Sequence, residues 1–179
     1  MPTILSHAVL PVALGVGLGG RVVSRRLLVA GVAASILPDL DVLTFQFNVA
    51  YADALGHRGV SHSIAFAAFA AFVALLFAHR LNTGRLAAFL FVGVCTASHG
   101  VLDMFTNGGY GVALWWPISD ERVFAPWQVI EVSPLSLRRF LSSRGLEVLR
   151  SEFLWIWLPA MAVCGALVLL RRTSGRGDR

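Results

Sequence analysis

Residues 86–105 read LAAFLFVGVCTASHGVLDMF, an apolar run that carries two ionisable side chains, His99 and Asp103, near its end. A helix needs about 20 mostly apolar residues to cross a bilayer, so this run predicts a membrane span. Ionisable side chains are costly at membrane depth and therefore mark a candidate functional site. The two residues are four apart, which places them on one helix face, one turn from each other.

The composition of the whole chain also indicates a membrane protein. Hydrophobic residues make up 56% of the 179 residues and charged residues 14%, and the mean hydropathy is +0.71. A soluble domain is about 45–50% apolar and about 25% charged. The net charge of +5 comes from few charges in an apolar chain, which argues against nucleic-acid binding, disorder and a coiled coil.

Two residue types narrow the chemistry further. All fifteen basic residues are arginines, and a chain without lysine cannot use a Schiff-base or P-loop lysine. Cys95 and Cys164 both fall inside apolar runs, where cysteine is typically a small core residue. We therefore expect neither a disulfide framework nor a cysteine-based zinc site.

We expect an all-α, polytopic membrane bundle of about five helices, formed by residues 1–179 as a single domain. The predicted spans are residues 2–20, 27–38, 61–78, 86–105 and 153–170. The second is short for a span and could equally be a buried or re-entrant helix. The first lacks the basic start and small-residue cleavage site of a signal peptide.

Residues 106–152 form the one long segment predicted to lie outside the membrane core. Its second part, residues 135–150, alternates leucines with arginines, which is typical of an amphipathic helix in the membrane interface. We expect Gly145 to interrupt this helix. A surface segment without a chemical role is the alternative interpretation.

The arginines predict the orientation. Alternate connections and the C-terminus carry nine arginines and one acid, against six arginines and nine acids on the other side. By the positive-inside rule the arginine-rich face is cytoplasmic, with the C-terminus inside and the N-terminus outside. All five tryptophans and both tyrosines fall on the opposite side, as in an aromatic belt.

Four predicted helices bring ionisable side chains to that outer face. They are His7, Asp39, Asp41, His57, His62, His99 and Asp103. Histidine and carboxylate ligands without thiolate suit zinc, manganese or iron. Because a catalytic zinc takes about three protein ligands, either two or three ions share the site or some residues are hydrogen-bond partners and proton carriers. For each residue alone, a polar helix end is the alternative.

The residues fall into two predicted roles. The predicted metal ligands are His7, Asp39, Asp41, His62, His99 and Asp103. The predicted catalytic residues are His57, Asp41 and Arg58. His57 or an aspartate not used as a ligand would act as general base or leaving-group acid. Arg58 has two interpretations, a phosphate clamp and a salt bridge to Asp39 or Asp41.

Several motifs together resemble one family. They are Ser6-His7, Leu37-Pro38-Asp39-Leu40-Asp41, His57-Arg58-Gly59-Val60-Ser61-His62-Ser63, Ser98-His99-Gly100-Val101-Leu102-Asp103 and Leu114-Trp115-Trp116-Pro117. From His7 to about Pro117 the chain resembles the YdjM-like family of bacterial inner-membrane proteins, described as metal-dependent hydrolases. The resemblance implies a His/Asp metal centre and a distant relation to zinc-dependent phospholipase C. The resemblance implies that the family's metal positions correspond to three pairs: His99 and Asp103, His57 and His62, and Asp39 and Asp41.

We therefore expect a membrane-bound, metal-dependent hydrolase at the outer face of the cytoplasmic (inner) membrane. One or two divalent ions, zinc foremost with manganese or iron as alternatives, would activate water against an amphiphilic substrate, such as a phospholipid or another phosphoester. Membrane lipids are the expected partners, and nucleic acid is not. Two alternatives stay open: a metal or proton transporter, and a structural or regulatory protein whose metal ties helices together. The H-E-x-x-H and G-x-S-x-G motifs are absent.

Overall fold

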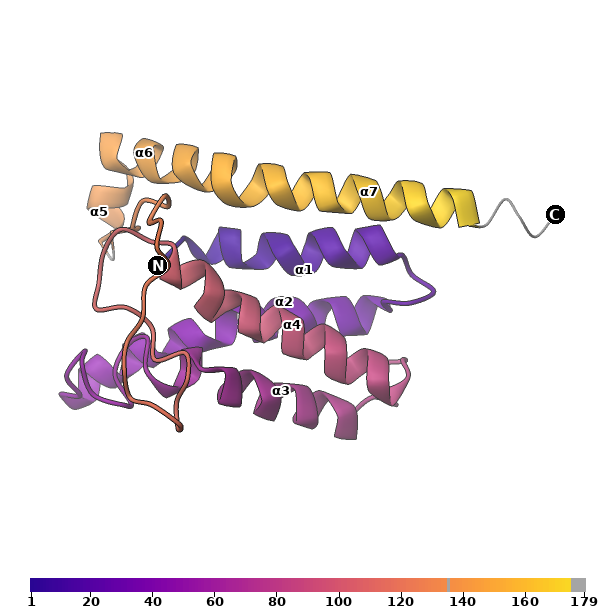
Figure 1. The fold of residues 1–179 in the computed structure, drawn as a ribbon, viewed down its shortest axis with the longest axis horizontal. Helices are drawn as coiled ribbons and strands as arrows, with labels where there is room; N and C mark the ends of the chain where they lie inside the picture. The colour runs from indigo at the N-terminus through magenta and orange to yellow at the C-terminus, as the bar shows by residue number, and fades with distance from the viewer. Residues whose placement is uncertain (135, 175–179) are drawn as a thin grey trace.

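The computed structural model describes residues 1–134 and 136–174, and within them every regular element is a helix. Two isolated β-bridges are the only extended pairings in this part of the chain. Figure 1 shows the long helices side by side, with the connecting loops, α5 and α6 gathered at the end that holds the N-terminus. The predicted all-α class is confirmed for the described residues.

The first two helices, α1 (Ile4–Leu18) and α2 (Arg25–Ile36), run side by side in opposite directions (Figure 1). α2 begins after Ser24, whose hydroxyl accepts the backbone N–H of Leu27 at 3.0 Å. This cap satisfies one of the donors that a helix start leaves free. The turn before α2 carries Arg21, and α2 itself begins with Arg25 and Arg26, so three arginines gather at this connection.

α2 continues into a 3-10 helix, η1 (Leu37–Phe47), instead of ending as a short helix. The change begins at Pro38, which lacks a backbone N–H and crowds the preceding turn. The combined element Arg25–Phe47 has 23 residues and a mean hydropathy of 1.7, long and apolar enough to cross a membrane. The span predicted over 27–38 is therefore too short. The chain stays helical beyond Pro38, and only the type of helix changes there.

α3 (Ile64–Leu76) has 13 residues and is shorter than the predicted span 61–78. Its start is set by Ser63, whose hydroxyl accepts the N–H of Phe66 at 3.0 Å. The residues before it form a separate 3-10 turn, η2 (Val60–His62). That turn removes His62 from the membrane helix and leaves its ring at the bundle's end.

The chain's last helical segment has four parts. They are α5 (Leu137–Phe140), α6 (Ser143–Glu152), the π-helical turn η3 (Phe153–Trp157) and α7 (Leu158–Ser174). The predicted interruption at Gly145 is wrong, because the break lies at 141–142 and Gly145 is inside α6. A Cβ at Gly145 would lie 1.7 Å from the carbonyl oxygen of Phe140. Glycine therefore permits the close approach of α5 and α6. Leu135, where the amphipathic helix was predicted to begin, is outside the described residues.

Three helices are long and apolar enough to span a membrane: Arg25–Phe47, α4 (Arg85–Met104) and Ser143–Thr173. α4 begins and ends within one residue of the predicted span 86–105. α1 and α3 are apolar but shorter. The structure thus supports a polytopic membrane protein, and the predicted count of five spans is not confirmed.

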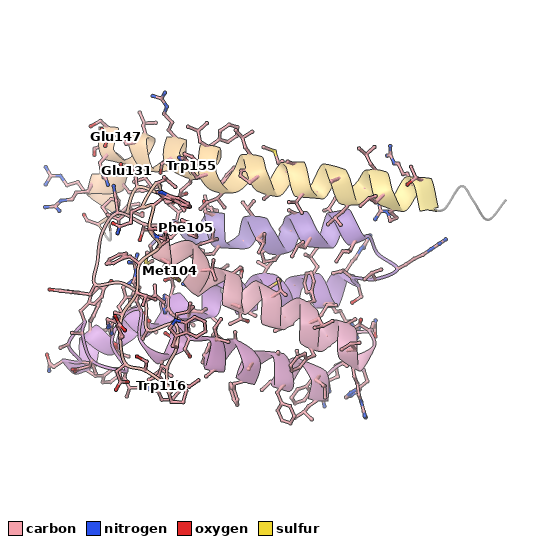
Figure 2. All side chains as sticks on the ribbon, in the orientation of Figure 1. Met104, Phe105, Trp116, Glu131, Glu147 and Trp155 are labelled. Atoms are coloured by element: carbon pink, nitrogen blue, oxygen red, sulfur yellow. The ribbon has the colours of Figure 1, made fainter. Side chains whose placement is uncertain are left out.

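The two ends of the bundle differ in chemistry. One end carries Arg21, Arg25, Arg26, Arg80, Arg85, Arg171 and Arg172. A core of small and branched apolar side chains, including Leu27, Ala88 and Cys95, fills the bundle near that end. At the opposite end, Figure 2 shows Trp116 among the loops, with Trp155, Glu131 and Glu147 near α6. All the ionisable residues of the predicted site lie at this second end.

Gly100 lets α4 touch η2, since a Cβ there would lie 2.3 Å from the backbone oxygen of His62. We expect Gly100→Ala to lower the unfolding free energy by about 1–3 kcal/mol, the usual cost of overpacking. At this chain length that corresponds to about 2–12 °C in Tm, measured by thermal unfolding in detergent. Gly165→Ala is the control, because no atom lies within 4 Å of its added methyl group. Equal Tm values for the two variants would contradict the tight contact.

Candidate metal centre

The i, i+4 pair on α4 lies inside a buried cluster. His99 and Asp103 are fully buried, and Asp39 of η1 and His62 of η2 meet them. One nitrogen or oxygen atom from each of the four residues lies within 4.8 Å of all the others. Three separate elements therefore place four potential metal ligands around one point.

The distances between the ligand atoms are short. His99 Nε2 lies 3.3 Å from Asp39 Oδ1, and His62 Nε2 lies 3.4 Å from Asp103 Oδ2. The two Nε2 atoms of His62 and His99 are 3.0 Å apart. Two imidazoles that point their nitrogens at each other and at two carboxylates form an arrangement typical of a shared cation.

The other nitrogen of each ring determines which form the imidazole takes. His99 Nδ1 lies 2.7 Å from the carbonyl oxygen of Ser35, which can only accept, so Nδ1 carries the proton. His62 Nδ1 lies 3.2 Å from Asp41 Oδ2, which likewise favours a proton on Nδ1. Both Nε2 atoms are then lone-pair donors facing the cluster. Such partners of a ligating histidine fix its tautomer and orientation.

The carboxylates supply a second test of whether these residues fit a metal. All four carboxylate oxygens of Asp39 and Asp103 are buried. Neither Asp39 oxygen has a hydrogen-bond partner among the described residues, and Asp103 is paired only on one side, with Arg58 at 3.0 Å. Buried charge without partners is strongly unfavourable. A divalent cation between two carboxylates and two imidazoles would satisfy them, and this donor set suits zinc, manganese or iron. These buried His/Asp groups could therefore hold a metal ion.

His7 of α1 lies against the same cluster. Its ring stacks on that of His99 with centroids 3.7 Å apart. Its Nε2 lies 3.7 Å from Asp103 Oδ1 and 3.9 Å from Asp39 Oδ2, and neither ring nitrogen has a hydrogen-bond partner among the described residues. The structure thus brings the predicted residue of the first helix to the cluster, at slightly longer range than the other four.

A second group, Asp41, His57 and His62, lies beside the first and could also hold an ion. Asp41 Oδ1 lies 2.6 Å from His57 Nδ1. Asp41 Oδ2 accepts the backbone N–H of Arg58 at 3.1 Å and the hydroxyl of Ser61 at 2.8 Å, in addition to facing His62. These donors occupy the Asp41 carboxylate. In this structure it orients two histidines, whereas the Asp39 carboxylate is left without donors.

Arg58 is fully buried and pairs with Asp103, Nε to Oδ2 at 3.0 Å. The predicted salt-bridge partners, Asp39 and Asp41, are therefore wrong. The backbone at Arg58 is left-handed, with φ of 63°, and the side chain runs toward the end of α4. There it donates to the carbonyl of Gly108 at 2.8 Å and to the hydroxyl of Thr106 at 2.7 Å. These contacts occupy all three nitrogens of the guanidinium, whose N–H donors a phosphate clamp would need.

Comparison with known proteins identifies the family. The profile of the YdjM inner membrane protein family matches residues 1–174. The chain belongs to this family. It is 46% identical over 173 residues to inner membrane protein YbcI of Escherichia coli (strain K12), covering 96% of this chain and 100% of that protein. No solved structure matches the chain. The resemblance predicted from the motifs is confirmed, and so is an inner-membrane protein with helices able to span a membrane.

Two residues important to this YdjM-family site were not predicted from the sequence. Glu152 is fully buried where α6 meets η3, and its carboxylate accepts the N–H and hydroxyl of Thr3 and the hydroxyl of Ser6 at 2.5–2.6 Å. It ties the last helix to the start of α1, just before His7. An acid directly preceding the apolar run 153–170 was the available signal.

Tyr51 is the second, with its ring edge-on to His57 at a centroid distance of 5.2 Å. Burial raises the pKa of the Tyr51 phenol above its ordinary value. Arg122 holds this loop by donating to the carbonyls of His57 at 2.9 Å and Tyr51 at 3.1 Å. Arg122 lies far from His57 and Tyr51 in the sequence, so no local pattern indicated these contacts.

Asp41→Asn tests the orienting role within the family fold. The amide keeps the shape but cannot accept from both histidines as a carboxylate does. We expect metal affinity to fall about 10–100-fold, the usual effect of removing a partner of a ligating histidine, measured by competition with a chelator. Asp53→Asn is the control, since its carboxylate caps only the backbone of its own loop, at Ala50. Unchanged affinity in Asp41→Asn would show that the contact does not support the site.

Proposed function

We propose that this protein is a membrane-embedded, metal-dependent hydrolase. The observation that carries the proposal is the buried cluster of Asp39, His62, His99 and Asp103, in which no described residue donates a hydrogen bond to the Asp39 carboxylate. A purely polar helix end would leave these charges in water. Here the chain buries them together and orients the imidazoles to donate lone pairs inward.

The same four residues would hold the metal, with His7 close enough to join them. A bound divalent ion supplies Lewis acidity, which polarises a scissile ester and lowers the pKa of coordinated water. His57 is the best-placed residue for proton transfer. Its ring lies 5.5 Å from that of His62, centroid to centroid. Its Nδ1–H is directed at Asp41, which leaves Nε2 to accept a proton.

The position of the site favours an amphiphilic substrate. The cluster lies at the end of apolar helices, opposite the arginine-rich end. The positive-inside rule supports a site at the extracytoplasmic face, with the C-terminus in the cytoplasm. A phosphoester lipid combines an apolar chain for the helices with an oxyanion for the metal, so it is the proposed substrate class.

A transporter would need polar groups through the depth of the bundle. Among the described residues, the buried ionisable groups stop at the site end, and the buried hydroxyls of Ser35 and Thr96 bond carbonyls of their own helices, at Val32 and Val92. Beyond them the interior is apolar, as at Leu27 and Ala88. This distribution supports catalysis at one face over transport.

The proposal is tested with purified protein reconstituted in phospholipid vesicles. We expect release of a water-soluble phosphoester headgroup or of diacylglycerol, loss of this release on removal of metal by a chelator, and recovery with zinc or manganese. The readout is mass spectrometry of the lipid products. Metal-stimulated ion uptake without any lipid product would instead support the transporter, and bound metal with neither activity would support a structural role.

A further inference from the structure

A groove of about 450 Å³ leads from the outside of the bundle to the metal cluster. It lies between the start of α1, the junction of α2 with η1, and α5. Its lining includes Leu5, Ile36, Asp39, Leu40, Leu137 and Phe140. Its volume falls within the range of about 300–1,000 Å³ usual for pockets that hold small molecules.

Asp39 joins the groove to the site. Asp39 is one of the residues that line the groove, and its carboxylate lies 3.3 Å from His99 Nε2. Both carboxylate oxygens of Asp39 are buried and have no hydrogen-bond partner among the described residues, so the groove ends against the residue that carries this charge. A ligand seated in the groove would therefore have one end directly beside the cluster.

The sides of the groove include exposed leucines from the apolar helix α1, from the candidate span Arg25–Phe47 and from the short helix α5. Leu5 of α1 is 60% exposed, Leu40 of η1 53% and Leu137 of α5 72%. Leu40 belongs to the candidate span Arg25–Phe47. An exposed leucine on a membrane-spanning helix would face lipid, so we infer that the groove opens sideways to the bilayer on the side of Leu40. That opening fits a hydrocarbon chain better than a water-soluble molecule.

Two exposed arginines of α5, named here the Arg138–Arg139 rim, stand between two groove residues in the sequence. In the short helix α5, Leu137 and Phe140 line the groove, whereas Arg138 and Arg139 between them are exposed. Neither arginine forms an ion pair with a residue that the structure describes. A basic, amphipathic turn of this kind binds the anionic headgroup region of a membrane.

We propose that this groove holds one acyl chain of a bilayer phospholipid, whose phosphodiester lies between the Arg138–Arg139 rim and the metal cluster at Asp39. Apolar walls, a lateral opening, a cationic rim and a metal-ligating floor match the successive parts of one phospholipid molecule. The claim that the bound lipid is the substrate rests on the proposed hydrolase function. The claim that the groove binds a phospholipid is independent of that function.

The test uses the full chain in nanodiscs with a phosphatidylglycerol that carries a photoreactive diazirine in mid-chain. Mass spectrometry then locates the crosslinks. We expect labelling concentrated on the start of α1, η1 and α5. Leu40→Trp should lower groove labelling about tenfold, equivalent to about 1.4 kcal/mol. Leu43→Trp is the matched control, because Leu43 is similarly exposed on η1 but does not line the groove. Leu137→Trp on α5 provides a second groove-filling variant should the first fold poorly.

A second comparison tests the rim. We expect Arg138→Ala with Arg139→Ala to reduce labelling by phosphatidylglycerol more than labelling by a diacylglycerol with the same diazirine chain. Arg150→Ala, at an exposed arginine of α6, is the control. Equal labelling in the groove-filled and control variants would overturn the groove proposal, even if lipid hydrolysis is observed. Groove labelling without hydrolysis in the same nanodiscs would retain the groove and reject the hydrolase.

Discussion

His99→Ala is expected to abolish both stoichiometric metal binding and lipid hydrolysis while leaving the protein folded in detergent. His99 Nε2 faces Asp39 at 3.3 Å and His62 at 3.0 Å, at the centre of the cluster. Removing a direct ligand should weaken metal binding by more than the roughly 10–100-fold lost with a hydrogen-bond partner. The measurement is metal per chain by elemental analysis of purified protein, with hydrolysis assayed in parallel.

Two variants make this result specific. His79→Ala removes the exposed histidine at the arginine-rich end and should leave both readouts unchanged. Asp103→Asn removes the second α4 ligand charge with little change of shape, and should also lose the metal. Wild-type metal content in both His99→Ala and Asp103→Asn would show that the cluster is buried polar pairing, and the hydrolase proposal would fail with it.

Arg58→Met is expected to cause the largest loss of stability of any single arginine change at this end of the bundle. The fully buried guanidinium pairs with Asp103 and donates to Gly108 and Thr106. Breaking a buried ion pair on one side costs about 3–5 kcal/mol, because the other charge stays buried without a partner. At this chain length that corresponds to about 6–20 °C in Tm, measured by thermal unfolding in detergent.

The matched control is Arg138→Met, which makes the same chemical change at an exposed arginine with no described ion-pair partner. Its Tm should stay close to that of the wild type, since exposed substitutions usually change stability by less than about 0.5 kcal/mol. Added zinc should restore part of the loss in Arg58→Met, because a cation at the cluster also compensates Asp103. If Arg58→Met keeps the wild-type Tm but loses lipid binding, the phosphate-clamp interpretation of Arg58 would be supported over the structural one.

The Arg58 contact shows what local patterns leave open. The motif around it correctly indicated a cation near carboxylates, but the predicted partners were Asp39 and Asp41. The choice of Asp103 depends on the left-handed backbone at Arg58 and on the position of the α4 end, about 45 residues later in the chain. No periodicity or spacing within the motif carries that information.

The helices also divide into those that local patterns predict and those that they do not. The run 86–105 predicted α4 to within one residue, because length and hydropathy suffice for a continuous apolar helix. The bounds of the other helices depend on single residues. Ser63 caps α3 and shortens it, and next to Pro38 the α-helix α2 is followed directly by the 3-10 helix η1. A contact with Phe140 explains Gly145, which by itself resembled a helix break.

By itself, the sequence determined the membrane class, the helical composition, the family and the end of the bundle where His and Asp residues gather. The class, the helices and the site end follow from composition, hydropathy and i, i+4 spacing, which are properties of short segments. The family follows from the resemblance of the quoted motifs. Only the tertiary structure decided which aspartate lacks donors, which one orients histidines, and that Asp39 also lines a lateral groove. Those roles depend on distances between residues far apart in the chain, and packing of separate helices sets such distances.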